Sequence, residues 1–366
     1  MANFVLASAP MPDPPPEPIL TLVLTSVDLT DPRIPIFHIS ADTPKPPYTR
    51  DHSTPTRSYT EVERLSSHLA ARFPDRLPPI PPPLPTKDSV PLFRSRIQSF
   101  LNRIAARFGD VDAVVSFVES EFEFAPSGVL QTKKSGFFTA FSGGSIHVKE
   151  VDVFFESAKG SVGACEAALG MCARVGEKAG RVEREIGATA LEVGNLLLEL
   201  DVGDRKGLGG ALRKLGKGFI ASEKPHVDQA NYLTHQFAAD AKTFMRETQA
   251  AQTALTYRLT TLQSYETACK ATQKKLASLD RLRSSSSIKQ ERVDAALVDL
   301  QEVKQQEGEC RAQFRNVSER LKDEYVRFCS ELDVEVREVV DSYVEAQKEG
   351  AKKELAVWES VLAGFA

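Results

Sequence analysis

The chain has 366 residues, with 46 Lys and Arg against 50 Asp and Glu and 42% hydrophobic residues, which is typical of a folded protein with room for two domains. No apolar run reaches the ~18–20 residues of a spanning helix, and the first residues lack a signal-peptide pattern, so we expect a cytoplasmic protein. The five cysteines are an odd number without a CxxC pair, which favours buried free thiols over disulfides or a zinc site.

Proline divides the chain into two unlike parts. Of the 22 prolines, 21 lie at or before Pro126, and the last one is Pro225. Proline lacks an amide hydrogen and clashes with the preceding helical turn. The residues after Pro126 can therefore form long helices, whereas the residues before it cannot.

The N-terminal part alternates between strand and helix patterns. Residues 20–29 and 34–40 predict two antiparallel strands. Thr60, with Glu63 three residues later, predicts a capping box at the start of a helix. Residues 74–85 are rich in proline and predict an extended polyproline segment, and two further helical patterns cover residues 92–104 and 111–118. The expected fold is a small α+β domain with an antiparallel sheet.

The C-terminal part shows three long helical patterns, which end near Leu200, Leu282 and Leu362. One apolar stripe runs along the first of them, from Val151 to Leu200, and needs a partner. Such lengths predict an elongated three-helix coiled coil, which buries little surface per residue and is therefore expected to dimerise. Pro225 predicts a kink or a restart early in the second helix.

Seven glycines interrupt the first of these helices, and each costs up to ~1 kcal/mol relative to alanine in a helix interior. Two explanations are open: close helix approach offsets the cost, or the helix is locally frayed or bent. The glycines are Gly160, Gly163, Gly170, Gly176, Gly180, Gly187 and Gly194.

Several motifs resemble the phox-homology (PX) domain. They are Arg57-Ser58-Tyr59, the run from Leu77 to Pro81, and the helix from Arg96 to Ile104. With three long helices behind it, the chain resembles a PX-BAR sorting nexin. The resemblance implies an N-terminal tail (1–17), a PX domain (18–125), a linker with an amphipathic helix (126–146) and a BAR domain (147–365). The ending Trp358-Glu359-Ser360 is similar to that of the endosomal-recycling and autophagy-linked subfamily.

The resemblance also implies a site for phosphatidylinositol 3-phosphate. Tyr59 matches the aromatic residue under the inositol ring, and Lys87 lies where the family places a lysine for the 1-phosphate. Ser58 and Phe93 stand at the two positions where the family has arginines. The nearest arginines are one residue away, so the candidate lipid-binding residues are Arg57, Tyr59, Lys87 and Arg94. The alternative is a degenerate pocket in a domain kept for protein contacts.

Other segments are candidates for membrane contact. Ahead of the first long helix, the lysine pair Lys133 and Lys134 adjoins Phe137, Phe138 and Phe141, which favours insertion at a bilayer interface; docking on the helical domain is the alternative. Basic residues also gather near the serine run that separates the second and third helices, at the distal tip of the BAR domain that the resemblance implies. They are Lys270, Lys274, Lys275, Arg281 and Arg283.

Catalysis, cofactors, metals and nucleic acid are not expected. The segment Gly207–Gly218 departs from the phosphate-loop frame, and no GxSxG or HExxH motif occurs. The pI of about 6.0 disfavours nucleic-acid binding. We expect a peripheral endosomal membrane protein that acts as a homodimer or as a heterodimer with another sorting nexin and serves curvature-dependent protein sorting. The alternative is a coiled-coil adaptor that works through protein contacts.

Overall fold

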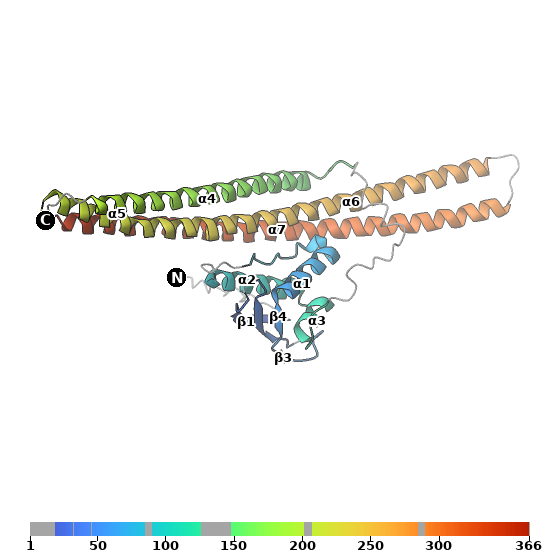
Figure 1. Cartoon of the computed structure of the whole chain (residues 1–366). Helices are drawn as coiled ribbons and strands as arrows, with labels where there is room; N and C mark the ends of the chain where they lie inside the picture. Colours follow the sequence, from blue (N-terminus) through green and yellow to red (C-terminus); the bar gives the residue numbers. More distant parts are fainter. Residues whose placement is uncertain are drawn as a thin grey trace, which may run out of the picture.

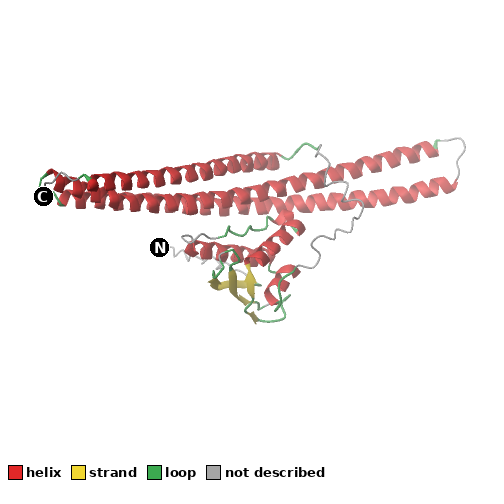
Figure 2. Cartoon of the chain, in the orientation of Figure 1, coloured by secondary structure: helices red, strands yellow, loops and turns green. Residues whose placement is uncertain are grey.

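A small N-terminal domain lies against the side of an elongated helical domain (Figure 1). This computed structural model describes residues 19–31, 33–44, 46–84, 90–125, 148–200, 207–284 and 290–365. Both domains appear in the predicted order, with strands confined to the first and long helices in the second (Figure 2). The predicted fold class is confirmed.

The sheet of the N-terminal domain is built around one central strand. Strand β2 (Ile36–Asp42) pairs antiparallel with β1 (Thr21–Asp28) and with the short strands β3 (His52–Ser53) and β4 (Thr56–Ser58). The two longer strands were predicted from their alternating patterns, whereas β3 and β4 are too short to show a period of two residues. The inward side chains of β1 and β2, including Leu22, Phe37 and Ile39, are buried in the domain core.

Three helices cover this sheet: α1 (Tyr59–Arg72), α2 (Val90–Phe108) and α3 (Asp112–Glu119). The predicted capping box is wrong by two residues. Ser58 is the N-cap of α1, and its hydroxyl accepts a bond from the amide of Glu61, whose carboxylate accepts from the Ser58 amide. The predicted polyproline segment also begins too early, because Pro74–Arg76 forms a 3-10 turn, η1, before the irregular residues 77–84.

The helical domain consists of α4 (Val153–Glu199), α5 (Leu208–Asn231), a π-helical segment η3 (Tyr232–Phe237), α6 (Ala238–Arg283) and α7 (Gln290–Ala363). Segments α5, η3 and α6 follow one another directly and form the predicted second helix. Helix α5 continues through Pro225, which is buried, so the expected restart at that residue is wrong. The irregular turns lie further along, at η3.

The glycines of α4 form its contact face with α5 and η3. The buried ones are Gly170, Gly176, Gly180, Gly187 and Gly194. A Cβ atom at Gly194 would lie 2.7 Å from the carbonyl oxygen of Gly216 and 3.0 Å from the amide nitrogen of Ile220. Close helix approach therefore explains four of these glycines, whereas a Cβ atom at Gly170 would only touch the Met245 sulfur atom of α6 at 3.4 Å, an ordinary contact distance. In contrast, a Cβ atom at Gly160 or Gly163 meets open space.

Replacing Gly194 by alanine should destabilise the helical domain, because the new methyl group meets backbone atoms that cannot move aside. The expected cost is about 1–3 kcal/mol, against a gain of about 0.5–1 kcal/mol for Gly160→Ala, where only helix propensity changes. Urea unfolding of the two variants measures this contrast. Equal midpoints would show that α4 and α5 do not approach as closely as described.

The apolar stripe of α4 is only partly covered in the single chain. Phe155, Ala158 and Val162 are buried at its start, but Val175, Val182 and Leu200 are exposed. Part of the stripe that was predicted to need a partner thus finds none within the described residues.

The cysteines are free, as predicted, but none is fully buried. Cys172 and Cys329 are exposed, and Cys165, Cys269 and Cys310 are partly buried. The prediction of buried thiols is wrong because the bundle is thin and leaves much of each helix surface in water.

Candidate lipid-binding site and interdomain contact

Tyr59 begins α1 and is almost completely buried. Its hydroxyl donates a 2.8 Å hydrogen bond to the carbonyl oxygen of Pro82, and burial raises the pKa of Tyr59 to about 12. Phe93 of α2 is 2% exposed, and its ring centroid lies 6.5 Å from that of Tyr59. An apolar ring therefore occupies the position where the PX resemblance implies an arginine.

Arg57 lies inside the N-terminal domain, 3% exposed, on β4. Its guanidinium donates to the carbonyl oxygens of Phe117 at 2.8 Å, Ser120 at 2.5 Å and Thr56 at 3.0 Å. Its Nη1 atom also lies 3.8 Å from the Glu61 carboxylate. Burial lowers the pKa of Arg57. Arg57 thus ties the end of α3 to the sheet, and its donors are directed at protein acceptors.

The other candidate residues are dispersed. Arg94 lies on α2 and donates a 3.2 Å hydrogen bond to the Thr25 carbonyl oxygen of β1. Lys87, Lys133, Lys134, Phe137, Phe138 and Phe141 lie outside the described residues. The basic residues of the distal tip lie in the last turns of α6. Lys275 pairs with Asp299 of α7 at 2.5 Å, and Lys270 lies 3.8 Å from Glu266. The other basic residues of the tip are Lys274, Arg281 and Arg283.

The interdomain contact contains a row of arginines that sequence reasoning missed. Arg96, Arg103 and Arg107 share one face of α2, because their spacing of seven and four residues matches the helical period. Arg96 pairs with Asp240 of α6, and Arg107 pairs with Glu331 of α7.

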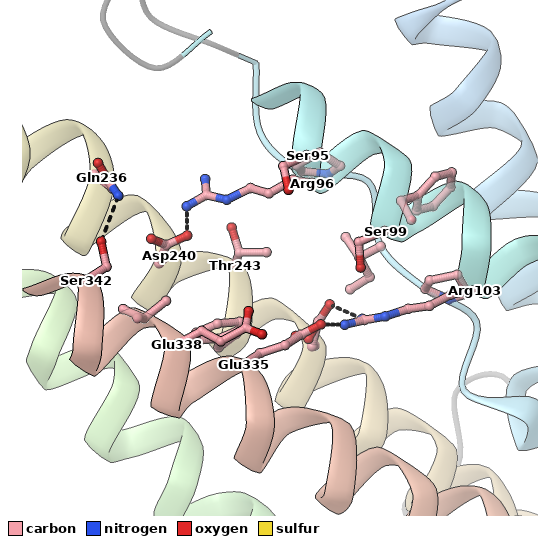
Figure 3. A pocket seen from close by; sticks show the side chains of 17 residues that line it. Ser95, Arg96, Ser99, Arg103, Gln236, Asp240, Thr243, Glu335, Glu338 and Ser342 are labelled. Carbon is pink, nitrogen blue, oxygen red and sulfur yellow. Dashed lines mark hydrogen bonds and ion pairs between the residues drawn. The ribbon is translucent and has the colours of Figure 1, made fainter. Parts of the chain in front are cut away.

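Arg103 bridges both long helices (Figure 3): it bonds to Glu247 of α6 at 3.0 Å and pairs with Glu335 of α7. The spacing of the arginines was visible in the sequence. Their acidic partners, more than 100 residues away, were not.

A leucine adds an apolar contact to these ion pairs. Leu77 has a left-handed backbone (φ 46°) and is 5% exposed among Phe155, Leu255 and Leu321 of the helical domain. Its carbonyl oxygen accepts a 3.1 Å bond from Arg107. Beside it, Asp75 accepts a 2.9 Å bond from Arg320 of α7. The N-terminal domain is thereby docked through both charge and apolar burial.

Glu247 is buried in this contact, and desolvation raises its pKa although the neighbouring Arg103 lowers it. A carboxyl group with a raised pKa in the folded state stabilises the fold most below its ordinary pKa, and loses that contribution as pH rises through the raised value. Glu247→Gln should therefore gain stability relative to the wild type as pH increases above about 4.5. Thermal unfolding across pH measures this difference, with the exposed Glu345→Gln as control. A constant difference across pH would contradict it.

Two observations concern other kinds of site. No helix in the described part of the chain is long and apolar enough to cross a membrane. Among the same residues, no group of three or more His, Cys, Asp or Glu side chains is arranged to hold a metal ion.

A thin bundle of long helices that carries a docked α+β domain defines a BAR-type protein with a PX-like module. Residues 130–363 match the family model described as Vps5 C terminal like, which covers more than half of the chain. The chain belongs to this family, the sorting nexins with a BAR domain. The family consists of non-enzymatic proteins that associate peripherally with membranes in endosomal sorting.

Three solved structures are similar to the chain to different degrees, and the first of them shares its fold. The cryo-EM structure of the SNX-BAR Mvp1 tetramer is 15% identical with a TM-score of 0.55, over 89% of this chain and 95% of that chain. The D.Discoideum IBARa I-BAR domain is 12% identical, with a TM-score of 0.37, over 58% of this chain and 89% of its own. The Hof1p F-BAR domain is 14% identical, with a TM-score of 0.38, over 60% of this chain and 89% of its own. No curated protein sequence matches significantly.

Proposed function

We propose that the chain is a dimeric scaffold that binds phosphoinositide-bearing endosomal membranes and senses or generates their curvature for retrograde or recycling transport. The observation that carries this proposal is an exposed apolar surface on the helical domain. On α4 it includes Met171, Val175, Val182 and Ile186. These four residues are spaced by four, seven and four positions and therefore share one face of α4. An exposed apolar helix face of this kind marks an interaction site. The C-terminal part of α7 also carries exposed apolar residues, namely Val340, Val344, Leu355 and Leu362.

We propose phosphatidylinositol 3-phosphate as the lipid. In this proposal Tyr59 and the polyproline segment form one side of the site, called its wall, and Lys87 and Arg94 bind the headgroup beside it. Arg57 stabilises this wall from inside the domain. Membrane affinity is increased by Phe137, Phe138 and Phe141 with Lys133 and Lys134, and by the basic distal tip of α6. Each basic side chain near an anionic bilayer adds about 1 kcal/mol.

A second candidate function is supported by one contact. Phe93 packs on Tyr59 where the resemblance implies an arginine that binds the ring hydroxyls of the inositol, so the pocket on this domain lacks one of the usual headgroup ligands. This favours an adaptor that takes much of its lipid affinity from the other subunit of a heterodimer. The two functions differ in whether the purified chain binds phosphoinositide vesicles by itself.

The test combines the oligomeric state with vesicle tubulation. The double variant Val182→Glu and Ile186→Glu places charges in the apolar surface, and we expect dimerisation to weaken about 100-fold or more and tubulation to disappear. Val23→Glu, at an exposed apolar residue of β1, is the control. Sedimentation velocity and electron microscopy of vesicles with and without the phosphoinositide give the readout. A variant that still dimerises and tubulates would contradict the scaffold proposal.

A further inference from the structure

A basic cavity lies at the junction of the two domains. It measures about 290 Å³ and is enclosed by Pro83 and Leu84 of the proline-rich segment, Phe93 and Arg96 of α2, and residues 234–246 of η3 and α6. Its charged or ionisable lining residues are Arg96, His235, Lys242 and Arg246, and no Asp or Glu among the described residues lines it. The neighbouring cavity of about 200 Å³, also lined by Arg96 and Thr243, contains Asp240, Glu247, Glu335 and Glu338 (Figure 3). The first cavity is thus lined mainly by basic side chains, whereas four carboxylates line the second.

The basic cavity retains excess positive charge after its ion pairs are counted. Arg96 is neutralised by Asp240, and Lys242 pairs with Glu177 of α4 while its side chain stays 51% exposed. Within the part of the chain that the structure describes, Arg246 makes no ion pair or hydrogen bond. Its charge reaches Tyr59, whose pKa it lowers against the larger effect of burial. Arg246 therefore lies beside the wall of the candidate lipid site with an unused guanidinium.

The backbone beside the cavity is unusual as well. His235 lies in η3, and π-helical segments are rare and frequently occur at functional sites. Tyr232 and Gln236 of the same segment each form a 3.2 Å hydrogen bond with the Ser342 hydroxyl of α7. These bonds anchor η3 to α7 on one side, while Thr234 and His235 contribute to the cavity.

We propose that this junction cavity binds the phosphate groups of a phosphorylated inositol, with Arg246 and Lys242 as ligands and a ring nitrogen of His235 as a third donor. A phosphomonoester carries about −1.5 to −2 charges and is bound best by a forked guanidinium, which only Arg246 offers without a competing carboxylate. The site requires both domains, because Arg246 and Lys242 belong to α6 whereas Phe93 and Leu84 belong to the N-terminal domain. If the ligand is the headgroup of a membrane lipid, this inference rests on the proposed membrane function. A soluble inositol phosphate presents the same phosphate groups to the cavity.

The experiment uses the full chain and the double variant Arg246→Ala and Lys242→Ala. Calorimetry with the soluble headgroup inositol 1,3-bisphosphate measures the site itself. Co-sedimentation with vesicles containing phosphatidylserine, with and without phosphatidylinositol 3-phosphate, measures the lipid arm. Lys304→Ala, an exposed lysine of α7 remote from the cavity, is the control for loss of charge, and circular dichroism checks folding. We expect the variant to bind the headgroup at least about ten-fold more weakly, and Arg246→Lys to lose less.

The outcomes separate the two sources and the two proposals. Loss of headgroup binding together with the phosphoinositide-dependent part of vesicle binding supports the site with a lipid ligand. Loss of headgroup binding alone supports the site with a soluble ligand. Unchanged headgroup affinity in the folded variant, or no headgroup binding by the wild type, overturns the site. Neither of these two results would affect the membrane function if phosphatidylserine vesicles are still bound and tubulated.

Discussion

Reversing the charge of Arg103 and Arg107 should release the N-terminal domain from the helical domain. In the wild type these guanidinium groups face Glu247, Glu331 and Glu335 in a largely buried contact. Arg103→Glu with Arg107→Glu places carboxylates against carboxylates there. Breaking one buried pair costs about 3–5 kcal/mol, so two reversals exceed what Leu77 and the remaining Arg96–Asp240 and Asp75–Arg320 pairs can restore. Small-angle scattering should show a larger radius of gyration.

The control is Arg94→Glu, which makes one such charge reversal on α2 but beside β1. It should leave the scattering curve unchanged. Adding Glu331→Arg and Glu335→Arg to the double variant restores opposite charges across the contact and should recover much of the docking, as a double-mutant cycle would measure. A double variant with the wild-type scattering curve would show that Leu77 and the remaining Arg96–Asp240 and Asp75–Arg320 pairs are enough to hold the domains together.

Replacing Arg57 by alanine should unfold the N-terminal domain under mild conditions. The change leaves the carbonyl oxygens of Phe117 and Ser120 without their donors and Glu61 without its nearby charge, inside the domain. Each buried group left unsatisfied costs about 1–3 kcal/mol, so a total near 3–5 kcal/mol is expected. Thermal unfolding followed by circular dichroism should show an early transition for this domain, while the long helices melt as before.

This variant also decides between two roles for Arg57. If Arg57 supports the fold, Arg57→Ala loses phosphoinositide binding only in proportion to the unfolded fraction, and Arg94→Ala melts like the wild type. A variant with wild-type melting that no longer binds phosphoinositide vesicles would instead make Arg57 a direct lipid ligand.

Local patterns predicted most of the elements, and the errors have identifiable causes. The strands β1 and β2 and the long helices were found because their periods of two and of about 3.6 residues persist over many residues. The start of α1 was placed two residues late because Thr60 with Glu63 has the same spacing as the true pair, Ser58 with Glu61. Sequence spacing alone does not tell which hydroxyl faces the helix end.

The candidate site shows the same limit. A resemblance in sequence placed Arg57 and Tyr59 together, but burial decides what each can do, and Arg57 bonds to carbonyl groups of the distant segment 117–122. The glycines of α4 are a similar case. The sequence showed what they cost in helix stability, and the close approach of α5 and η3 shows why four of them are favoured. The role of each of these residues is set by contacts with residues far away in the chain, which local sequence patterns do not reveal.

By itself, the sequence determined the division of the chain, because proline excludes long helices before Pro126 and its scarcity afterwards permits them. It also determined the class of fold, through local periodicity. Only the tertiary structure decided which arginines hold the domains together and which one has no ion-pair partner among the described residues at their junction. The reason is electrostatic. An arginine contributes to docking if folding brings a carboxylate next to it, and it can bind a ligand if folding does not. The carboxylates that pair with Arg96 and Arg103 lie in helices more than 100 residues away in the chain.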